Sequence, residues 1–89
     1  MTMMKMVNVT EVKGEGLVGL IGQRVTLFCL NYIYTGLLSG VDDTCVRLDD
    51  AAIVYETGSF DDPKWKDSQE LPNQHYVMRS AIESFGMVK

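Results

Sequence analysis

The chain is poor in the residue types that build small disulfide or metal scaffolds. Its 89 residues include two cysteines, one histidine and two prolines. Two cysteines make neither a disulfide framework nor a four-cysteine zinc site. Cys29 and Cys45 each stand in an apolar run, which favours buried thiols, although a disulfide between them stays open at this level. We therefore expect no metal and no other cofactor.

An excess of basic residues and a long apolar run are also missing. The net charge is −4, from 8 basic and 12 acidic residues, which argues against a protein that coats DNA regardless of sequence. A local basic patch is still compatible with this balance, because phosphates respond to local potential. No apolar stretch approaches the ~20 residues that span a membrane, and the first residues contain no signal-peptide core. The sequence predicts a soluble, cytoplasmic protein.

Candidate catalytic groups are equally scarce. His75 is the only histidine and no cysteine stands near it in the sequence, so a packing or interface role is favoured over that of a base. The aspartate pairs at 42–43, 49–50 and 61–62 are typical of turns. The glycine-rich segment 14–19 lacks the preceding strand and the following lysine of a phosphate-binding loop. We expect a protein that is not an enzyme.

Hydrophobic patterning predicts β-structure after an N-terminal arm. The arm covers residues 1–13, with a short strand at 7–12 as one option, and a single helical turn is expected within 16–22. Strands are expected at 24–31, 35–41, 44–48, 75–79 and 81–85, and residues 51–55 continue or follow the third strand. Gly36 and Gly40 predict a bend or bulge in the second strand.

Five short strands in fewer than about 75 residues fit a small barrel better than a sandwich. The predicted fold class is all-β: a small, strongly bent, five-stranded open barrel after a short helical turn. It forms one domain at 14–89, in which the polar segment 58–73 is a long variable loop. Within that loop, Lys64, Trp65 and Lys66 could bind a nucleic-acid strand, but the acidic residues around them favour Trp65 as an anchor of the loop on the barrel.

Two blocks of the sequence resemble the Sm/LSm family, to which bacterial Hfq belongs. The first block, VTLFCLNYIYTGLLSGVDDTCVRL at 25–48, resembles the Sm1 motif. It has an apolar first strand, Asn31 at the turn, Gly36 at the start of strand two and Asp42 before strand three. It is one residue shorter than Hfq between Asn31 and Gly36.

The second block, MRSAIESF at 78–85, looks like the Sm2 motif in its Hfq form. Arg79 and Ser80 stand where Hfq has lysine and histidine, and Ala81 and Ile82 match its Ala-Ile pair. The order of elements is similar over about residues 16–86, and the chain is also similar to the Sm-like proteins of marine phages.

The resemblance implies an SH3-like barrel whose fourth and fifth strands are open edges. In this family each edge pairs with a neighbouring copy, so the implied partner is the chain itself, in a ring of about five to seven subunits. Such pairing also removes the aggregation hazard of an unpaired edge. The second implied partner is single-stranded RNA.

Two faces of such rings bind RNA. On the uridine-binding face the resemblance places Asp43, Thr44, Arg79 and Ser80. Arg79 alone keeps the family's chemistry there, since Thr44 cannot stack a base and Asp43 adds negative charge.

On the opposite face the resemblance places Phe28 at the adenine-stacking position, with Tyr32 and Tyr34 in the turn beside it. An alternative interpretation has Phe28 in the core and the two tyrosines packed against a neighbouring subunit.

The resulting functional hypothesis is a non-catalytic ring that binds single-stranded nucleic acid, RNA first of all, in RNA or DNA processing. The alternative is a structural or protein-interaction ring that has lost RNA binding. The acidic balance favours the alternative, while Arg79 and the tyrosine turn favour nucleic-acid binding.

Overall fold

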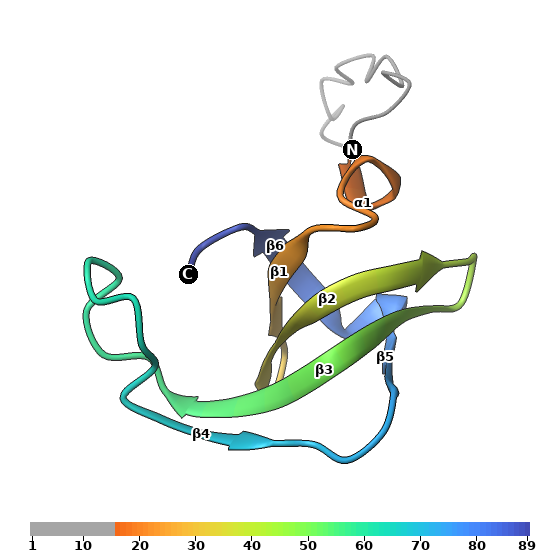
Figure 1. Ribbon diagram of the computed structural model, residues 1–89. Helices are drawn as coiled ribbons and strands as arrows, with labels where there is room; N and C mark the ends of the chain where they lie inside the picture. Colours follow the sequence, from red (N-terminus) through yellow and green to blue (C-terminus); the bar gives the residue numbers. More distant parts are fainter. Residues whose placement is uncertain (1–15) are drawn as a thin grey trace, which may run out of the picture.

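The computed structural model describes residues 16–89, so the predicted arm at 1–13 and its optional strand at 7–12 lie outside the described residues. The described chain is almost entirely β-structure (Figure 1). Its elements are α1 (Gly16–Gly19), β1 (Arg24–Cys29), β2 (Ile33–Val41), β3 (Cys45–Glu56), β4 (Asp67–Glu70), β5 (His75–Met78), the 3₁₀ turn η1 (Arg79–Ala81) and β6 (Ile82–Gly86). The all-β class and the single helical turn before β1 are confirmed. No helix within 16–89 has the length and apolar character needed to cross a membrane.

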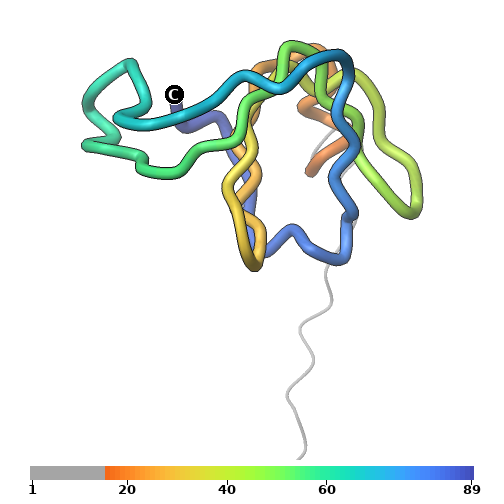
Figure 2. The backbone as a smooth tube through the Cα atoms, turned by 90° about the horizontal axis from the view of Figure 1, so that it is seen from below, coloured from red at the N-terminus to blue at the C-terminus, as the bar shows by residue number. Residues whose placement is uncertain are grey.

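The strands form one antiparallel sheet in the order β4-β3-β2-β1-β6, and β5 pairs with β3 as well. The 12-residue β3 therefore has two partners along one edge, β5 at its beginning and β4 at its end. The sheet curls strongly, so that β6 returns beside β1 (Figure 2). β5 and β6 do not pair with each other, and the sheet is not closed.

The sheet has six strands, and the prediction of five was wrong. Residues 44–48 and 51–55 belong to one continuous strand, β3, and the segment 58–73 is not a plain loop because it contains β4. All four β4 residues are polar and exposed, so no alternation of apolar side chains marks this strand in the sequence. Instead, β4 forms because the free edge of β3 offers backbone N–H and C=O groups with which it can pair.

The inner face of the sheet carries the main hydrophobic core. Leu27, Leu38, Val46 and Leu48 are completely buried there, and Val77 of β5 packs against them. Helix α1 adds Leu17 to the same cluster.

The outer face is buried where the chain folds back over it. Thr26 and Thr35 are buried directly opposite each other on β1 and β2, and Ala52 of β3 continues the row. Beside them, the rings of Phe28 and Phe60 meet edge to face with centroids 6.4 Å apart. Residues 25–27 of β1 are consequently buried in succession, as expected for a strand covered on both faces.

The bend predicted at Gly36 and Gly40 is confirmed. The register of β2 against β3 shifts between Thr35 and Leu37, and again between Leu38 and Gly40. At Gly36 the strands approach so closely that a Cβ would lie 3.0 Å from the carbonyl oxygen of Asp49. At Gly40 the nearest atom would be 3.7 Å away, which is an ordinary contact.

Gly36→Ala should therefore destabilise the domain by about 2 kcal/mol, because the new methyl group overlaps backbone that cannot move alone. Urea unfolding measures this loss, and Gly40→Ala is the matched control, which should stay within about 0.5 kcal/mol of the wild type. Equal losses in both variants would contradict the close approach at Gly36.

Candidate nucleic-acid interface

The turn between β2 and β3 is held by the carboxylate of Asp42. Its Oδ1 atom accepts hydrogen bonds from the backbone N–H groups of Thr44, at 2.7 Å, and Cys45, at 2.8 Å. The hydrogen bonds from Cys45 and then Thr44 lower the pKa of Asp42, because they stabilise its charged form. The turn is thus fixed by an ionised side chain at its first position.

Arg79 joins this turn from the other end of the chain. Its backbone N–H donates to the carbonyl oxygen of Thr44 at 2.9 Å, and its Nη1 atom donates to the carbonyl oxygen of Asp42 at 2.8 Å. Asp43, Thr44, Arg79 and Ser80 are all exposed around this contact. The structure therefore brings Arg79 and its neighbour Ser80 to the turn that contains Asp43 and Thr44, the four residues that the resemblance placed on the uridine-binding face.

A second arginine lies beside the same turn and was missed by sequence reasoning. Arg47 lines a pocket of about 230 Å³ together with Asp42 and Tyr76. Its Nε atom donates to the hydroxyl of Ser39 at 2.9 Å, and that hydroxyl donates to Oδ1 of Asp49 at 2.9 Å. Arg47 belongs to the first block, 25–48, but the resemblance assigns no role to it. Only the register of β3 shows that it lies beside this turn.

The predicted adenine-stacking residues lie on two different faces of the sheet. Phe28 lies opposite Ile33 in the register of β1 and β2, whereas Tyr34 lies opposite Leu27. Since successive side chains of a strand point to opposite faces, Phe28 and Tyr34 point away from each other. Phe28 packs on Phe60 of the outer face and is not brought together with the two tyrosines.

The two tyrosines form an aromatic group with His75. The rings of Tyr32 and Tyr34 meet at 6.4 Å, and the ring of His75 stacks on Tyr34 at 5.3 Å with 27° between the planes. Burial, followed by the charges of Cys29, Tyr32 and Tyr55, raises the pKa of Tyr34. Tyr32 remains 51% exposed and is the ring of this group that a base could reach.

The two cysteines and the tryptophan are half-buried. Cys29 and Cys45 are half-buried free thiols, so they form no disulfide. Burial raises the pKa of both, and the carboxylate of Asp42 raises that of Cys45 further. Trp65 is half-buried, and the ammonium of Lys89 lies 4.6 Å from the centroid of its ring.

Within the described part of the chain, no group of three or more histidine, cysteine or acidic side chains could hold a metal ion. Neither the models of known protein families nor the curated proteins give a match to this chain.

The lowered pKa of Asp42 leads to a prediction about pH. A carboxyl group with a lower pKa in the folded state stabilises it above the ordinary value near 4, and this contribution disappears as the pH falls through the lowered pKa. Wild type should therefore resist urea better than Asp42→Asn at neutral pH, and the difference should close in acid. Asp43→Asn removes the adjacent charge and is the control. A difference that is constant at all pH values would argue against the ionised turn.

Proposed function

We propose that this protein is an Sm-like subunit that assembles into a ring and binds single-stranded RNA without catalysing a reaction. The observation that carries the proposal is the contact of Arg79 with the turn at Asp42 and Thr44. Those two segments are separated by 37 residues in the sequence, yet they share one exposed surface. They are also the two segments that the resemblance assigns to one RNA site.

The chemistry of this surface suits a phosphate or a base edge. A guanidinium has five N–H donors, and the bond to the carbonyl of Asp42 uses one of the donors of Arg79. Cyclic symmetry would repeat Arg79 once per subunit, so that a weak single contact gains avidity along a strand of RNA. Arg47 adds a second cation beside Asp42. A local cationic site of this kind is compatible with a net charge of −4.

The strand arrangement supports the ring. If β4 is regarded as an addition, the remaining order is β6-β1-β2-β3-β5, with β5 and β6 as the two open edges. Both edges expose apolar side chains: Tyr76 and Met78 on β5 are 58% and 52% exposed, and Phe85 on β6 is 40% exposed. The β4 edge is polar throughout, which is how proteins protect an edge that stays in water. The contrast favours β5 and β6 as the edges that pair between subunits.

The structural or protein-interaction ring remains the second candidate because of the charges beside Arg79. Asp42 and Asp43 stand in the same turn, and both carboxylates would repel a phosphate. This ring would use the same edges without the RNA chemistry.

Light scattering tests the assembly. The wild type should form a closed oligomer of about five to seven subunits. Phe85→Lys should shift it towards monomers, because a charge on the β6 edge opposes burial in an interface. Ile21→Lys changes an equally exposed residue away from both edges and should leave the oligomer intact. A wild-type monomer at micromolar concentration would rule out the ring.

Fluorescence anisotropy with short oligo-U and oligo-A at low salt tests the binding. Arg79→Ala should weaken binding roughly tenfold and reduce its salt dependence, because a phosphate contact is lost. Tyr32→Ala should weaken binding with little change in salt dependence, since stacking releases no counterions. Lys66→Ala removes the same charge from a residue paired with Glu56 and serves as the control. If the wild type binds neither oligo-U nor oligo-A at about 10 μM, the structural ring is favoured.

A further inference from the structure

A second pocket, distinct from the Arg79 surface, lies on the outer face of the sheet. Its volume is about 400 Å³, which is within the range of small-molecule sites. Its floor follows a row of directly opposed residues, Thr35, Ala52 and Glu70, on three neighbouring strands. Thr35 and Ala52 are small, so the floor is low beside the larger side chain of Glu70.

One wall of the pocket is Pro63 and Trp65, which the loop after β3 carries over this face. The ammonium of Lys89 fixes the loop: it donates to the carbonyl oxygens of Thr57, at 2.7 Å, and Lys64, at 2.8 Å, while lying over the indole. The aromatic wall is therefore held in place before any ligand arrives, which lowers the entropy cost of binding.

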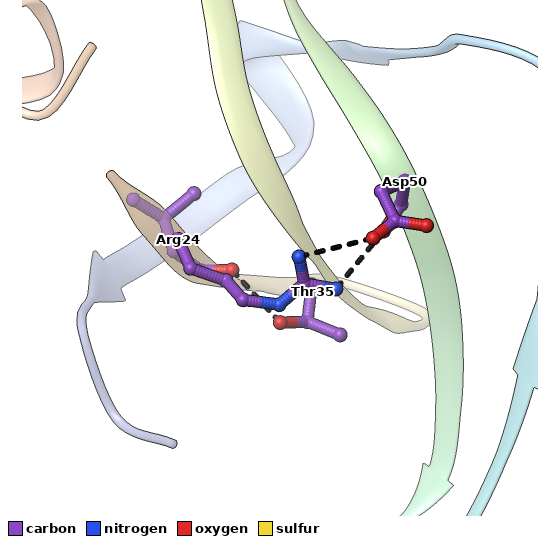
Figure 3. Close-up of polar contacts among 4 residues, drawn as sticks. Arg24, Thr35 and Asp50 are labelled. Atoms are coloured by element: carbon purple, nitrogen blue, oxygen red, sulfur yellow. Dashed lines mark hydrogen bonds and ion pairs between the residues drawn. The ribbon is translucent and has the colours of Figure 1, made fainter. Parts of the chain in front are cut away.

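The rim carries charges of both signs. Arg24 reaches from β1 across β2, past Thr35, to Asp50 on β3 (Figure 3). Its Nη2 atom donates to the carbonyl oxygen of Asp50 at 3.0 Å. Its Nη1 atom lies 3.5 Å from Oδ2 of Asp50, and the side chain of Asp50 is 80% exposed. Asp50 has a φ of 50°, a conformation that costs a non-glycine residue energy. Ser68 and Glu70 of β4 line another part of the pocket.

These groups restrict the ligand. Trp65 and Pro63 suit a flat ring, the carboxylates of Asp50 and Glu70 need hydrogen-bond donors, and Arg24 and Lys64 suit an anion. A simple anion would meet two carboxylates, and a flexible polyamine would meet three cations, Arg24, Lys64 and Lys89. A nucleotide whose base carries an exocyclic amino group satisfies all three requirements, because the amino group donates, the base stacks and the phosphate accepts.

We propose that the outer-face pocket binds a nucleotide with an amino-bearing base, the ring lying against Trp65 and the amino group donating to Asp50 or Glu70. The pocket is formed within one chain, so it requires neither the ring nor Arg79. Its occupant is either a free nucleotide or one residue of a bound strand.

Trp65 is the only tryptophan of the chain, so its fluorescence reports on this pocket directly. Titration of the full chain with AMP or CMP should quench the emission in a saturable way, excited at a wavelength that nucleotides do not absorb. UMP has no amino group and presents a single N3–H between two carbonyl oxygens. It should bind at least about fivefold more weakly, since a carbonyl oxygen then faces the carboxylate. Ribose 5-phosphate should cause no quenching. Oligo-A that quenches at lower nucleotide concentration than AMP would identify a strand as the source.

Two variants remove the carboxylates without disturbing the sheet. Asp50→Gly places glycine where φ is positive, so this chain should keep its fold, and Glu70→Ala changes an exposed edge residue. At least one should weaken AMP binding about tenfold, as loss of a charge-assisted hydrogen bond does. Glu83→Ala removes an exposed carboxylate on β6 and should have no effect. Arg79→Ala should leave AMP quenching unchanged, so failure at one site is distinguishable from failure at the other.

The proposal is overturned if neither AMP nor CMP quenches Trp65 at millimolar concentration, or if UMP quenches as strongly as AMP. Quenching that survives both Asp50→Gly and Glu70→Ala in chains with wild-type circular dichroism would also overturn it.

Discussion

The close approach of β3 to Gly36 is the contact on which the rest of the molecule depends. There the carbonyl of Asp49 occupies the space where any other residue of β2 would carry a side chain. The shift in register at this point lets β3 bend, so that its beginning pairs with β5 and its end with β4. Without the bend, the 12 residues of β3 would pair with β5 and β4 along one flat edge.

Both candidate sites follow from this bend. The first half of β3 follows the turn that meets Arg79 and ends at Asp50, on the rim of the outer-face pocket. The positive φ of Asp50 belongs to the same irregularity, since it follows directly on the shift opposite Gly36. The absence of a side chain at Gly36 thus affects the position of both the Arg79 surface and the outer-face pocket.

The sequence was informative where side-chain chemistry has a local pattern. The apolar, β-branched run at β1 and the glycines of β2 indicated a strand and a bend at the correct places, and the aspartate pairs at 42–43 and 61–62 indicated turns. The turn predicted at 49–50 was wrong, because these residues lie within β3. The pairing of Arg79 with the turn at Asp42 was accessible only through the resemblance, because no local pattern joins residues so far apart.

The remaining features depend on register and on tertiary contacts, which a single sequence does not display. Polar β4 owes its strand conformation to the free edge of β3, and Phe28 was grouped with Tyr34 because a turn of uncertain length hid which face each occupies. The outer-face pocket was missed for the same reason. Its residues come from four strands, a loop and the last residue described. Of these, Lys64 and Trp65 stood out in the sequence, but no local pattern joins them to the strand residues.

The position of β6 has a consequence for the order in which the domain folds. β1 pairs on one side with β2, which follows it at once, and on the other side with β6, which begins more than fifty positions later, at Ile82. Closing a short loop costs less chain entropy than closing a long one, so β1, β2 and β3 can associate as a meander before β6 is added. The last strand to join is then one of the two edges proposed to pair between subunits, so the proposed ring would require each chain to complete its folding first.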